Sequence, residues 1–392
     1  MHGLFRQNAL ARPCVGCFTV CRPIGRLFFC EAETSDRMTS PYEKLSPDAF
    51  WRTAVVGQPF ESIAGLYQKK FPISRSMPIA TAGSCFAQHI ARHLRKREFE
   101  LIDAEPAPPG LDPDEARRFG FGLYSARYGN IYTARQLRQI AQEAFGAFQP
   151  ADIVWQRNGR YFDALRPSVE PNGLASADAV LDHRAYHLRQ IRKVIQSSGL
   201  FIFTLGLTEA WTHVQSGTTF PTAPGVIAGD FDPTIHRFHN FTFQEVYDDL
   251  LAFFDLARSE NPTIRFLLTV SPVPLTATAS GEHVLRATVY SKSVLRAVAG
   301  QLYQERADVE YFPSFEVVTS PLSKSAFFEE NLRAVRPEGV EAAMNMFFAE
   351  HDDTSVQSRR DLEAMPALPP EHESVSDDEV VCEEVLLDAF AK

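Results

Sequence analysis

Short apolar runs alternate with amphipathic helical patterns from Met77 to His351, and this alternation limits the folds available to the chain. A short, continuous apolar run is typical of a buried strand, whereas apolar residues spaced three and four apart are typical of a helix. Strands that alternate with helices favour a parallel sheet, because a parallel connection needs a crossover of helical length. The sequence therefore predicts an α/β fold, a three-layer α/β/α sandwich with a mainly parallel sheet.

The individual elements are read from the same two periodicities, with helix ends taken from capping residues such as Thr133 and from the glycine at Gly199. The predicted strands are residues 78–83, 99–104, 200–206, 264–272 and 309–318, the last of them ending near Pro313. The predicted helices are residues 85–97, 133–145, 187–198, 242–261, 291–306 and 337–351.

Three further segments do not follow the alternation. Residues of about 104–180 are rich in proline and aromatic side chains, and we interpret them as an insertion in a domain of residues 38–351. Residues 1–37 are predicted to be a disordered leader, with Met38 as a natural start. Residues 352–392 carry 12 acidic and 3 basic side chains and are predicted to be an acidic disordered tail. Its end has helical spacing and could dock on an unknown protein partner.

Charge and cysteine content exclude several function classes. The net charge of −10 comes mostly from the tail, and no basic patch suited to nucleic acid is present. No apolar run is long enough to predict a membrane span. Because most cysteines precede residue 31, a disulfide framework for the main domain is excluded. Cys14 and Cys17 have zinc half-site spacing, but no second pair follows, so we expect no metal ion and no cofactor. We also expect a cytoplasmic protein.

Small and polar residues follow each of four predicted strands. In an open parallel sheet, ligands bind outside the carboxyl ends of the strands, so these turns are expected to meet at one edge. The turns are Gly83–Ser84, Gly206–Glu209, Ser271–Val273 and Pro313–Glu316.

Ser84 is the first candidate for chemistry, because it lies between an apolar strand and a helix. Unpartnered N–H groups at the helix start could hold an oxyanion, and Gly83 permits a tight turn. We expect Ser84 to be partly exposed in a pocket beside such N–H groups. The alternative is that Ser84 only caps the helix, as serine often does.

A serine nucleophile needs a base, and His283 is the histidine best placed by chain position, although a surface role is equally compatible with its loop. His89 and His93 have a spacing that could bind a metal, but no acidic partner is nearby. Cys85 is an alternative nucleophile, since a helix start lowers the pKa of a thiol. Adjacent side chains diverge, so we expect Ser84 to face the site and Cys85 to be buried.

The stretch "GSCFAQHI" resembles the signature of the GSCFA family. "YSARYGNIYTARQL", "FTLGLTEAW", "TVSPVPLTAT" and "YSKSVLRA" follow it in order, and the resemblance covers roughly residues 42 to 351. This family is similar to the SGNH (GDSL-like) hydrolases, which are α/β/α esterases and acyltransferases. The resemblance implies a serine nucleophile, an oxyanion hole shared by three sequence blocks, and a late Asp-x-x-His pair.

Carried over by position, Ser84 matches the nucleophile, and Gly129 with Asn130 loosely matches the second block. Gly206 begins the third block, where Thr208 stands in place of asparagine and Glu209 follows. The last block departs from the pattern, because Asn331 and Ala334 occupy the positions of the acid–base pair.

Three possibilities follow from this departure. In the first, His283 supplies the imidazole base. In the second, Glu209 or Glu316 acts as the base or orients it at the same edge of the sheet. In the third, the chain binds a ligand without chemistry. We expect a serine esterase or acyltransferase that acts on O-acyl groups of a carbohydrate or related polar metabolite. Its partner would be a small-molecule or glycan substrate, and Ser271 is among the expected binding residues. The alternatives are a non-catalytic ligand-binding or scaffold protein and a transferase that uses Cys85. The carbohydrate preference rests on the resemblance and on aromatic residues, namely Trp155, Tyr161 and Trp211.

Overall fold

The computed structural model describes residues 40–56, 58–59, 63, 65–351 and 383–391. The chain divides into two units, Met1–Ala54 and Val55–Lys392. The described part of the first unit forms the short helices η1 (Pro41–Lys44), η2 (Pro47–Ala49) and α1 (Trp51–Ala54), none of which buries a side chain. The predicted leader, residues 1–37, lies outside the described residues.

The second unit is a mixed α/β structure built on a four-stranded parallel sheet. Its strands lie in the order β1 (Ile79–Gly83), β4 (Leu200–Leu205), β8 (Arg265–Val270) and β9 (Val309–Tyr311). All three neighbouring pairs are parallel, so the carboxyl ends of the strands lie at one edge, as the sequence predicts. The predicted strand at 99–104 is wrong, because this segment contributes only one bridge, between Leu101 and Ile79.

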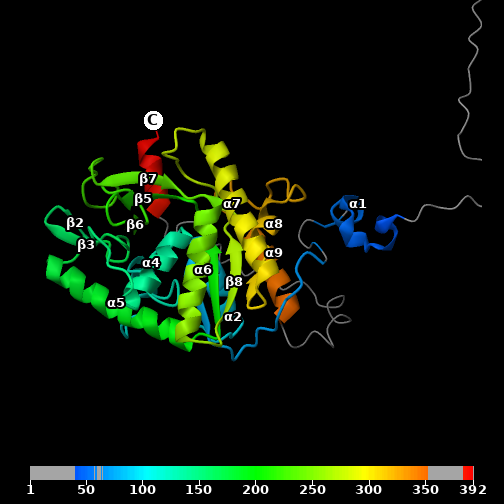
Figure 1. The fold of residues 1–392 in the computed structure, drawn as a ribbon, viewed down its shortest axis with the longest axis horizontal. Helices are drawn as coiled ribbons and strands as arrows, with labels where there is room; N and C mark the ends of the chain where they lie inside the picture. The colour runs from blue at the N-terminus through cyan, green and yellow to red at the C-terminus, as the bar shows by residue number, and fades with distance from the viewer. Residues whose placement is uncertain (1–39, 57, 60–62, 64, 352–382, 392) are drawn as a thin grey trace, which may run out of the picture. The chain divides into compact units, whose positions relative to one another are not determined.

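Helices pack against both faces of this sheet. One apolar cluster joins α4 (Ala134–Ala144), α5 (Ala177–Ser197), α6 (Phe243–Glu260) and α7 (Val284–Glu305) to the sheet. The other cluster joins α2 (Phe86–Lys96), α8 (Ser314–Thr319) and α9 (Pro337–His351) to the opposite face. Figure 1 shows α4, α5 and α6 on one side of β8, and α8 and α9 on the other.

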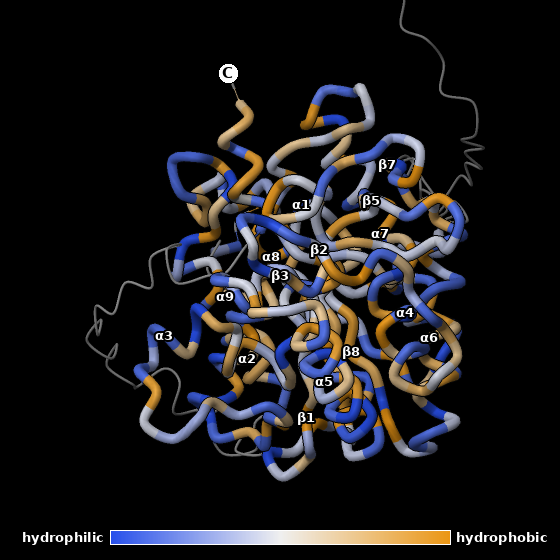
Figure 2. Tube along the Cα trace, turned by 90° about the vertical axis from the view of Figure 1, so that its left-hand side faces the viewer, coloured by the Kyte–Doolittle hydropathy of each residue, from blue (hydrophilic) through white to orange (hydrophobic). Residues whose placement is uncertain are grey.

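Alternation along the strands explains these two clusters. Phe201 and Phe203 of β4 belong to the first cluster, whereas Leu200 and Ile202 belong to the second. A strand directs successive side chains to opposite faces, so an unbroken apolar run suits a strand covered on both sides. Figure 2 shows this as hydrophobic colouring along β8, in contrast to the hydrophilic colouring along the short exposed helix α3 (Pro113–Arg118).

Two small antiparallel sheets extend this framework. A hairpin is formed by β2 (Val154–Arg157) and β3 (Arg160–Asp163). The second sheet has the order β6 (Thr219–Phe220), β5 (Glu209–His213), β7 (His236–Asn240). The predicted insertion at 104–180 holds the hairpin and α3, but it also contains α4, which packs into the main core. No helix in the described part of the chain is long and apolar enough to span a membrane.

The last residues of the predicted acidic tail are described by the structure as a short helix. Residues 352–382 lie outside the described residues, but Glu383–Phe390 form a 3-10 helix, η5. Glu383 and Glu384 are buried, at 2% and 8% exposure. Residues 383–391 thus include a short helix with two buried carboxylates, within the range for which the sequence predicts an acidic disordered tail.

Candidate functional site

The turn between β1 and α2 places Ser84 beside the neighbouring strand. Gly83 has a φ of +142°, and a Cβ atom there would lie 2.5 Å from the carbonyl oxygen of Thr204. Only glycine fits this close approach. The backbone N–H of Ser84 donates to the same Thr204 oxygen at 3.1 Å. The contact between β1 and β4 therefore fixes the position of Ser84, and it uses the N–H group that we expected to serve an oxyanion.

The Ser84 hydroxyl is buried and makes no hydrogen bond. Ser84 is 2% exposed, so the expectation of a partly exposed side chain is wrong. The capping role is also absent, because the N-cap residue of α2 is Cys85, and the Ser84 hydroxyl accepts from no backbone N–H. Buried polar groups nearly always have partners, so an unpaired hydroxyl at this turn needs an explanation.

A second segment runs along the free edge of β1 and brings polar side chains to its carboxyl end. The N–H of Thr81 donates to the Ser125 hydroxyl at 2.9 Å, and the N–H of Ile131 donates to the Gly83 carbonyl at 2.9 Å. Asn130 and Tyr132 consequently lie next to the Ser84 turn. Tyr124 completes the contact by donating from its hydroxyl to the Ser84 carbonyl at 3.2 Å.

The turn after β4 closes the other side of Ser84. A Cβ atom on Gly206 would lie 2.9 Å from the Cβ atom of Ser84 and 3.1 Å from the carbonyl oxygen of Tyr132. That carbonyl accepts the N–H groups of Gly206 and Leu207, at 3.1 and 2.9 Å. The sequence signals at Ser84, Asn130 and Gly206 thus meet at one place.

Lys292 of α7 is one of the residues at this site that the sequence prediction missed. It is 4% exposed, and its Nζ donates to the Gly206 carbonyl oxygen at 2.7 Å. Burial lowers the pKa of Lys292 to about 8, against opposing effects of Glu384 and Cys85 that raise it, while Arg333 lowers it further. A signal was present in "YSKSVLRA", because Lys292 lies on the apolar stripe of its helix with Leu295 and Ala299, and lysine is rarely buried there.

The end of the chain supplies two carboxylates to the same site. The Glu383 carboxylate accepts the Tyr132 hydroxyl at 2.8 Å and is also bonded by the Asn130 amide and the Ser168 hydroxyl. A Cβ atom on Gly129, whose φ is +68°, would lie 3.6 Å from this carboxylate. Two of the three donors to this carboxylate, Asn130 and Tyr132, therefore belong to the second motif of the signature, "YSARYGNIYTARQL".

Glu384 pairs with a cation from the late block. Arg333 donates to its carboxylate at 3.0 Å. Asn331, at the position where the resemblance implies an aspartate, accepts the N–H groups of Arg333 and Ala334, both at 2.9 Å. Ala334 is buried. This late segment therefore contributes a turn at Asn331 and the guanidinium of Arg333, in place of the acid–base pair that the resemblance implies.

Two of the predicted side chains are engaged elsewhere. The Thr208 hydroxyl donates to Asn240 at 2.7 Å, and its N–H donates to the Ser291 hydroxyl at 2.9 Å. Glu209 accepts the Thr278 hydroxyl at 2.8 Å, and burial raises its pKa. Both residues stabilise the loop after β4.

Ser271 and His283 have backbone partners. The Ser271 N–H donates to the Leu205 carbonyl at 2.8 Å, and its hydroxyl accepts the Val273 N–H at 3.3 Å. His283 is exposed, and its ring accepts the Leu285 N–H at 3.1 Å as the N-cap of α7. The structure therefore does not bring His283 to the Ser84 hydroxyl.

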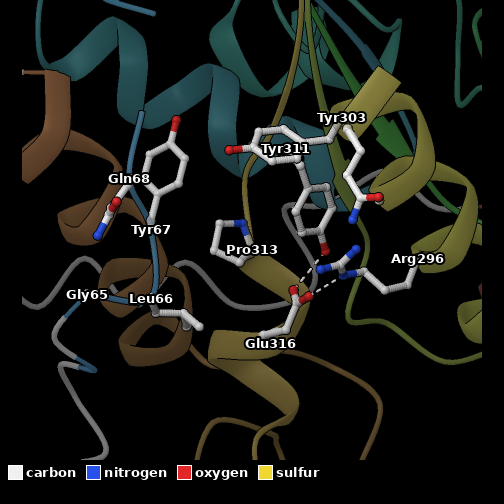
Figure 3. A pocket seen from close by; sticks show the side chains of 11 residues that line it. Gly65, Leu66, Tyr67, Gln68, Arg296, Tyr303, Tyr311, Pro313 and Glu316 are labelled. Atoms are coloured by element: carbon white, nitrogen blue, oxygen red, sulfur yellow. Dashed lines mark hydrogen bonds and ion pairs between the residues drawn. The ribbon is translucent and has the colours of Figure 1, made fainter. Parts of the chain in front are cut away.

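Glu316 lines a pocket that does not include Ser84. It accepts the Tyr311 hydroxyl at 2.7 Å and pairs with Arg296, as Figure 3 shows. This pocket has a volume of about 380 Å³ and is also lined by Tyr67 and Pro313. Ser84 and its neighbours Gly206 and Lys292 are not among its lining residues. Glu316 is thus held in an ion pair away from the Ser84 turn.

The aromatic residues offered for sugar stacking have other contacts. Trp155 is 3% exposed and packs on Phe220, with ring centroids 5.2 Å apart. Trp211 contacts Phe231 edge to face at 5.1 Å. Within the described residues, no group of three His, Cys, Asp or Glu side chains could hold a metal ion, and this includes His89 and His93.

Comparison with known proteins gives one match. The GSCFA family model matches residues 78–347, which include the Ser84 turn, the Asn130 segment, Gly206 and Lys292. No curated protein and no solved structure matches the chain. Because the matched range covers more than half of the sequence, the chain belongs to the GSCFA family.

Proposed function

We propose that this protein is a serine esterase or acyltransferase that acts on an O-acyl group of a small polar molecule. The observation that carries the proposal is the Ser84 hydroxyl, buried at the carboxyl end of β1 without a hydrogen-bond partner. Leaving a buried hydroxyl unpaired costs about 1–3 kcal/mol. A nucleophile whose partner is the substrate gives a physical reason for this cost.

Lys292 is the proposed general base. Its Nζ is bonded to the carbonyl of Gly206, the residue whose α-carbon faces Ser84. With a pKa of about 8, an appreciable fraction of the amine is neutral near neutral pH, and the neutral amine can accept the serine proton. Lys292 therefore replaces His283 in our proposal.

The reaction begins when Ser84 Oγ attacks the acyl carbon and its proton passes to Lys292 Nζ. The carbonyl oxygen becomes an oxyanion. Asn130 Nδ2 and the Tyr132 hydroxyl are its proposed donors, since both already hold a carboxylate oxygen of Glu383. Collapse breaks the ester bond, and the Lys292 ammonium returns the proton to the leaving alkoxide. Water or an acceptor hydroxyl then attacks the acyl-serine by the same steps in reverse.

An SGNH-like three-layer architecture is part of the proposal. A parallel sheet with helices on both faces, and a serine directly after β1, support it. The oxyanion donors differ from those the resemblance implies, because the Ser84 N–H and the Thr208 hydroxyl have other acceptors. The carbohydrate preference loses one support, because Trp155 is buried.

A second candidate is a ligand-binding protein without chemistry. The bonds of Glu383 to Asn130 and Tyr132 support it, because these two side chains hold a carboxylate of the chain itself. In that case Lys292 and Arg333 would serve as charges for an anionic ligand and not as a base.

Ester turnover separates the two candidates. The full-length protein is incubated with p-nitrophenyl acetate and, separately, with a fluorophosphonate probe followed by peptide mass spectrometry. We expect turnover and labelling of Ser84, both abolished in S84A and retained in C85A. Loss in C85A with retention in S84A would assign the chemistry to Cys85. Absence of both turnover and labelling would overturn the enzyme proposal in favour of ligand binding.

A further inference from the structure

We propose that the C-terminal segment, residues 383–391, is an internal competitor that occupies the candidate site with the carboxylates of Glu383 and Glu384. A ligand that carries a carboxylate would compete with the segment for the same donors. This inference rests on the proposed function for the location of the site, but not on turnover.

The contacts of Glu383 are those of a bound ligand. Its carboxylate is held by three side-chain donors, Asn130, Tyr132 and Ser168, none of which is close to it in sequence. A carboxylate is stable in a buried position only when hydrogen bonds replace its hydration. Two of these donors, Asn130 and Tyr132, come from the segment that lies beside the Ser84 turn, so the glutamate uses a recognition surface that belongs to the site.

The contacts of Glu384 add charge recognition. Arg333 donates to its carboxylate at 3.0 Å, and the carboxylate lies close enough to Lys292 to raise the pKa of that amine. The two glutamates therefore match two kinds of partner, hydrogen-bond donors for Glu383 and cations for Glu384. A cationic cluster of this kind would be costly without an anion.

The rest of the segment shows why this occupancy is displaceable. Leu386 and Phe390 are 48% and 67% exposed, so these apolar side chains do not anchor the segment in the core. Asp388 is exposed as well. Among the side chains that the structure describes in this segment, the two adjacent glutamates are the buried ones, and a free carboxylate ligand can compete for the same donors. Tethering gives the segment a high effective concentration, which lowers the apparent affinity of any competing ligand.

The first test measures binding in trans with the full-length chain. The probe is a fluorescein-labelled peptide of residues 379–392 with C382S, and binding is followed by anisotropy. We expect the double variant E383A/E384A to bind the peptide at least about tenfold more tightly than the wild type, because its own segment no longer competes. The control variant D388A, which removes an exposed carboxylate of the same segment, should bind as weakly as the wild type. A peptide carrying E383A/E384A should not bind.

The second test reads the site without added peptide. The rate of iodoacetamide alkylation of Cys85, a buried thiol near Lys292, is measured by mass spectrometry of its tryptic peptide. We expect alkylation at least about tenfold faster in E383A/E384A than in the wild type, unchanged in D388A, and slowed again by excess peptide. A cooperative thermal transition followed by circular dichroism establishes that the double variant is folded.

Equal peptide affinity for wild type and double variant, together with equal Cys85 rates, would overturn the inference. These readouts are independent of the enzyme proposal. If the double variant E383A/E384A binds the peptide but cleaves no ester, the proposed chemistry is refuted and the competitor is retained. If the protein cleaves esters but Cys85 is alkylated at the same rate in all variants, the proposed chemistry is retained and the competitor is refuted.

Discussion

The ammonium group of Lys292 donates a 2.7 Å hydrogen bond to the carbonyl oxygen of Gly206, whose α-carbon lies against the Cβ atom of Ser84. The glycine therefore connects the proposed nucleophile to the proposed base, one through its α-carbon and the other through its carbonyl. Substitutions of Gly206 or Lys292 therefore test the same contact beside Ser84.

Replacing Gly206 by alanine should damage this site. The new Cβ atom would lie 2.9 Å from Ser84 Cβ and 3.1 Å from the Tyr132 carbonyl, so Ser84 or Tyr132 must move. We expect G206A to lower the free energy of unfolding by about 1–3 kcal/mol, as overpacking does, and to abolish fluorophosphonate labelling. Urea unfolding measures the first effect.

The matched control is G300A in α7. There the only atom within 3 Å of a new Cβ is the end of the flexible Arg296 side chain, and alanine favours a helix by about 1 kcal/mol. G300A should be neutral or stabilising and should retain labelling. Equal destabilisation by both changes would show that the Gly206 contact is not special.

Lys292 should determine how any ester turnover depends on pH. Only the neutral amine accepts a proton, so the rate should rise with pH through about 8, the pKa of Lys292. K292M should lower kcat about 10²–10⁴-fold. K292R should stay inactive at high pH, because a guanidinium is not deprotonated.

Glu384 gives this pH profile a second test. Its negative charge raises the pKa of Lys292, so E384Q should move the rise to lower pH. A pH dependence that K292M retains and H283N loses would instead identify His283 as the base.

His187 should make the fold less stable in mild acid. It is fully buried, its Nδ1 is 2.6 Å from Glu105 Oε2, and burial lowers its pKa to about 4. The unfolded value is about 6.5. Between these values the unfolded chain binds more protons, so stability is present above about pH 6.5 and is lost as pH falls toward 4, by up to about 3 kcal/mol.

Thermal unfolding between pH 4 and 7 measures this loss. H187Q should reduce the slope of stability against pH. The control H283N replaces an exposed histidine by another good helix cap and should leave the slope unchanged. An identical slope in H187Q would contradict the assignment.

Asp163 should be one of the most important buried charges for stability. It accepts both Arg184 bonds at 3.0 Å and one from Arg166 at 2.8 Å, which ties β3 to α5. D163N leaves two buried guanidinium groups without this carboxylate and should cost about 3–5 kcal/mol. D114N, which breaks an exposed pair with Arg117, should change stability by less than about 1 kcal/mol.

Local patterns in the sequence determine many of the elements. Thr133 and Gln136 form the capping box that begins α4, and Pro337 begins the predicted helix α9. The hairpin β2–β3 could also have been predicted, because Asn158 and Gly159 form its turn with φ angles of 51° and 72°. Asn-Gly favours this geometry strongly. These features depend on residues close together in the chain, so a short window contains the information.

The residues that surround Ser84 could be decided only by the tertiary structure. Lys292 reaches Gly206 across 86 residues, and Glu383 reaches Asn130 across 253. The predicted strand at 99–104 fails for a similar reason, because Ser125 and Ile131 bond to the edge of β1 that this strand would have occupied. Periodicity specifies which face of an element is buried. It does not specify which distant side chains meet at the end of a sheet, since that depends on how the crossovers pack around one another.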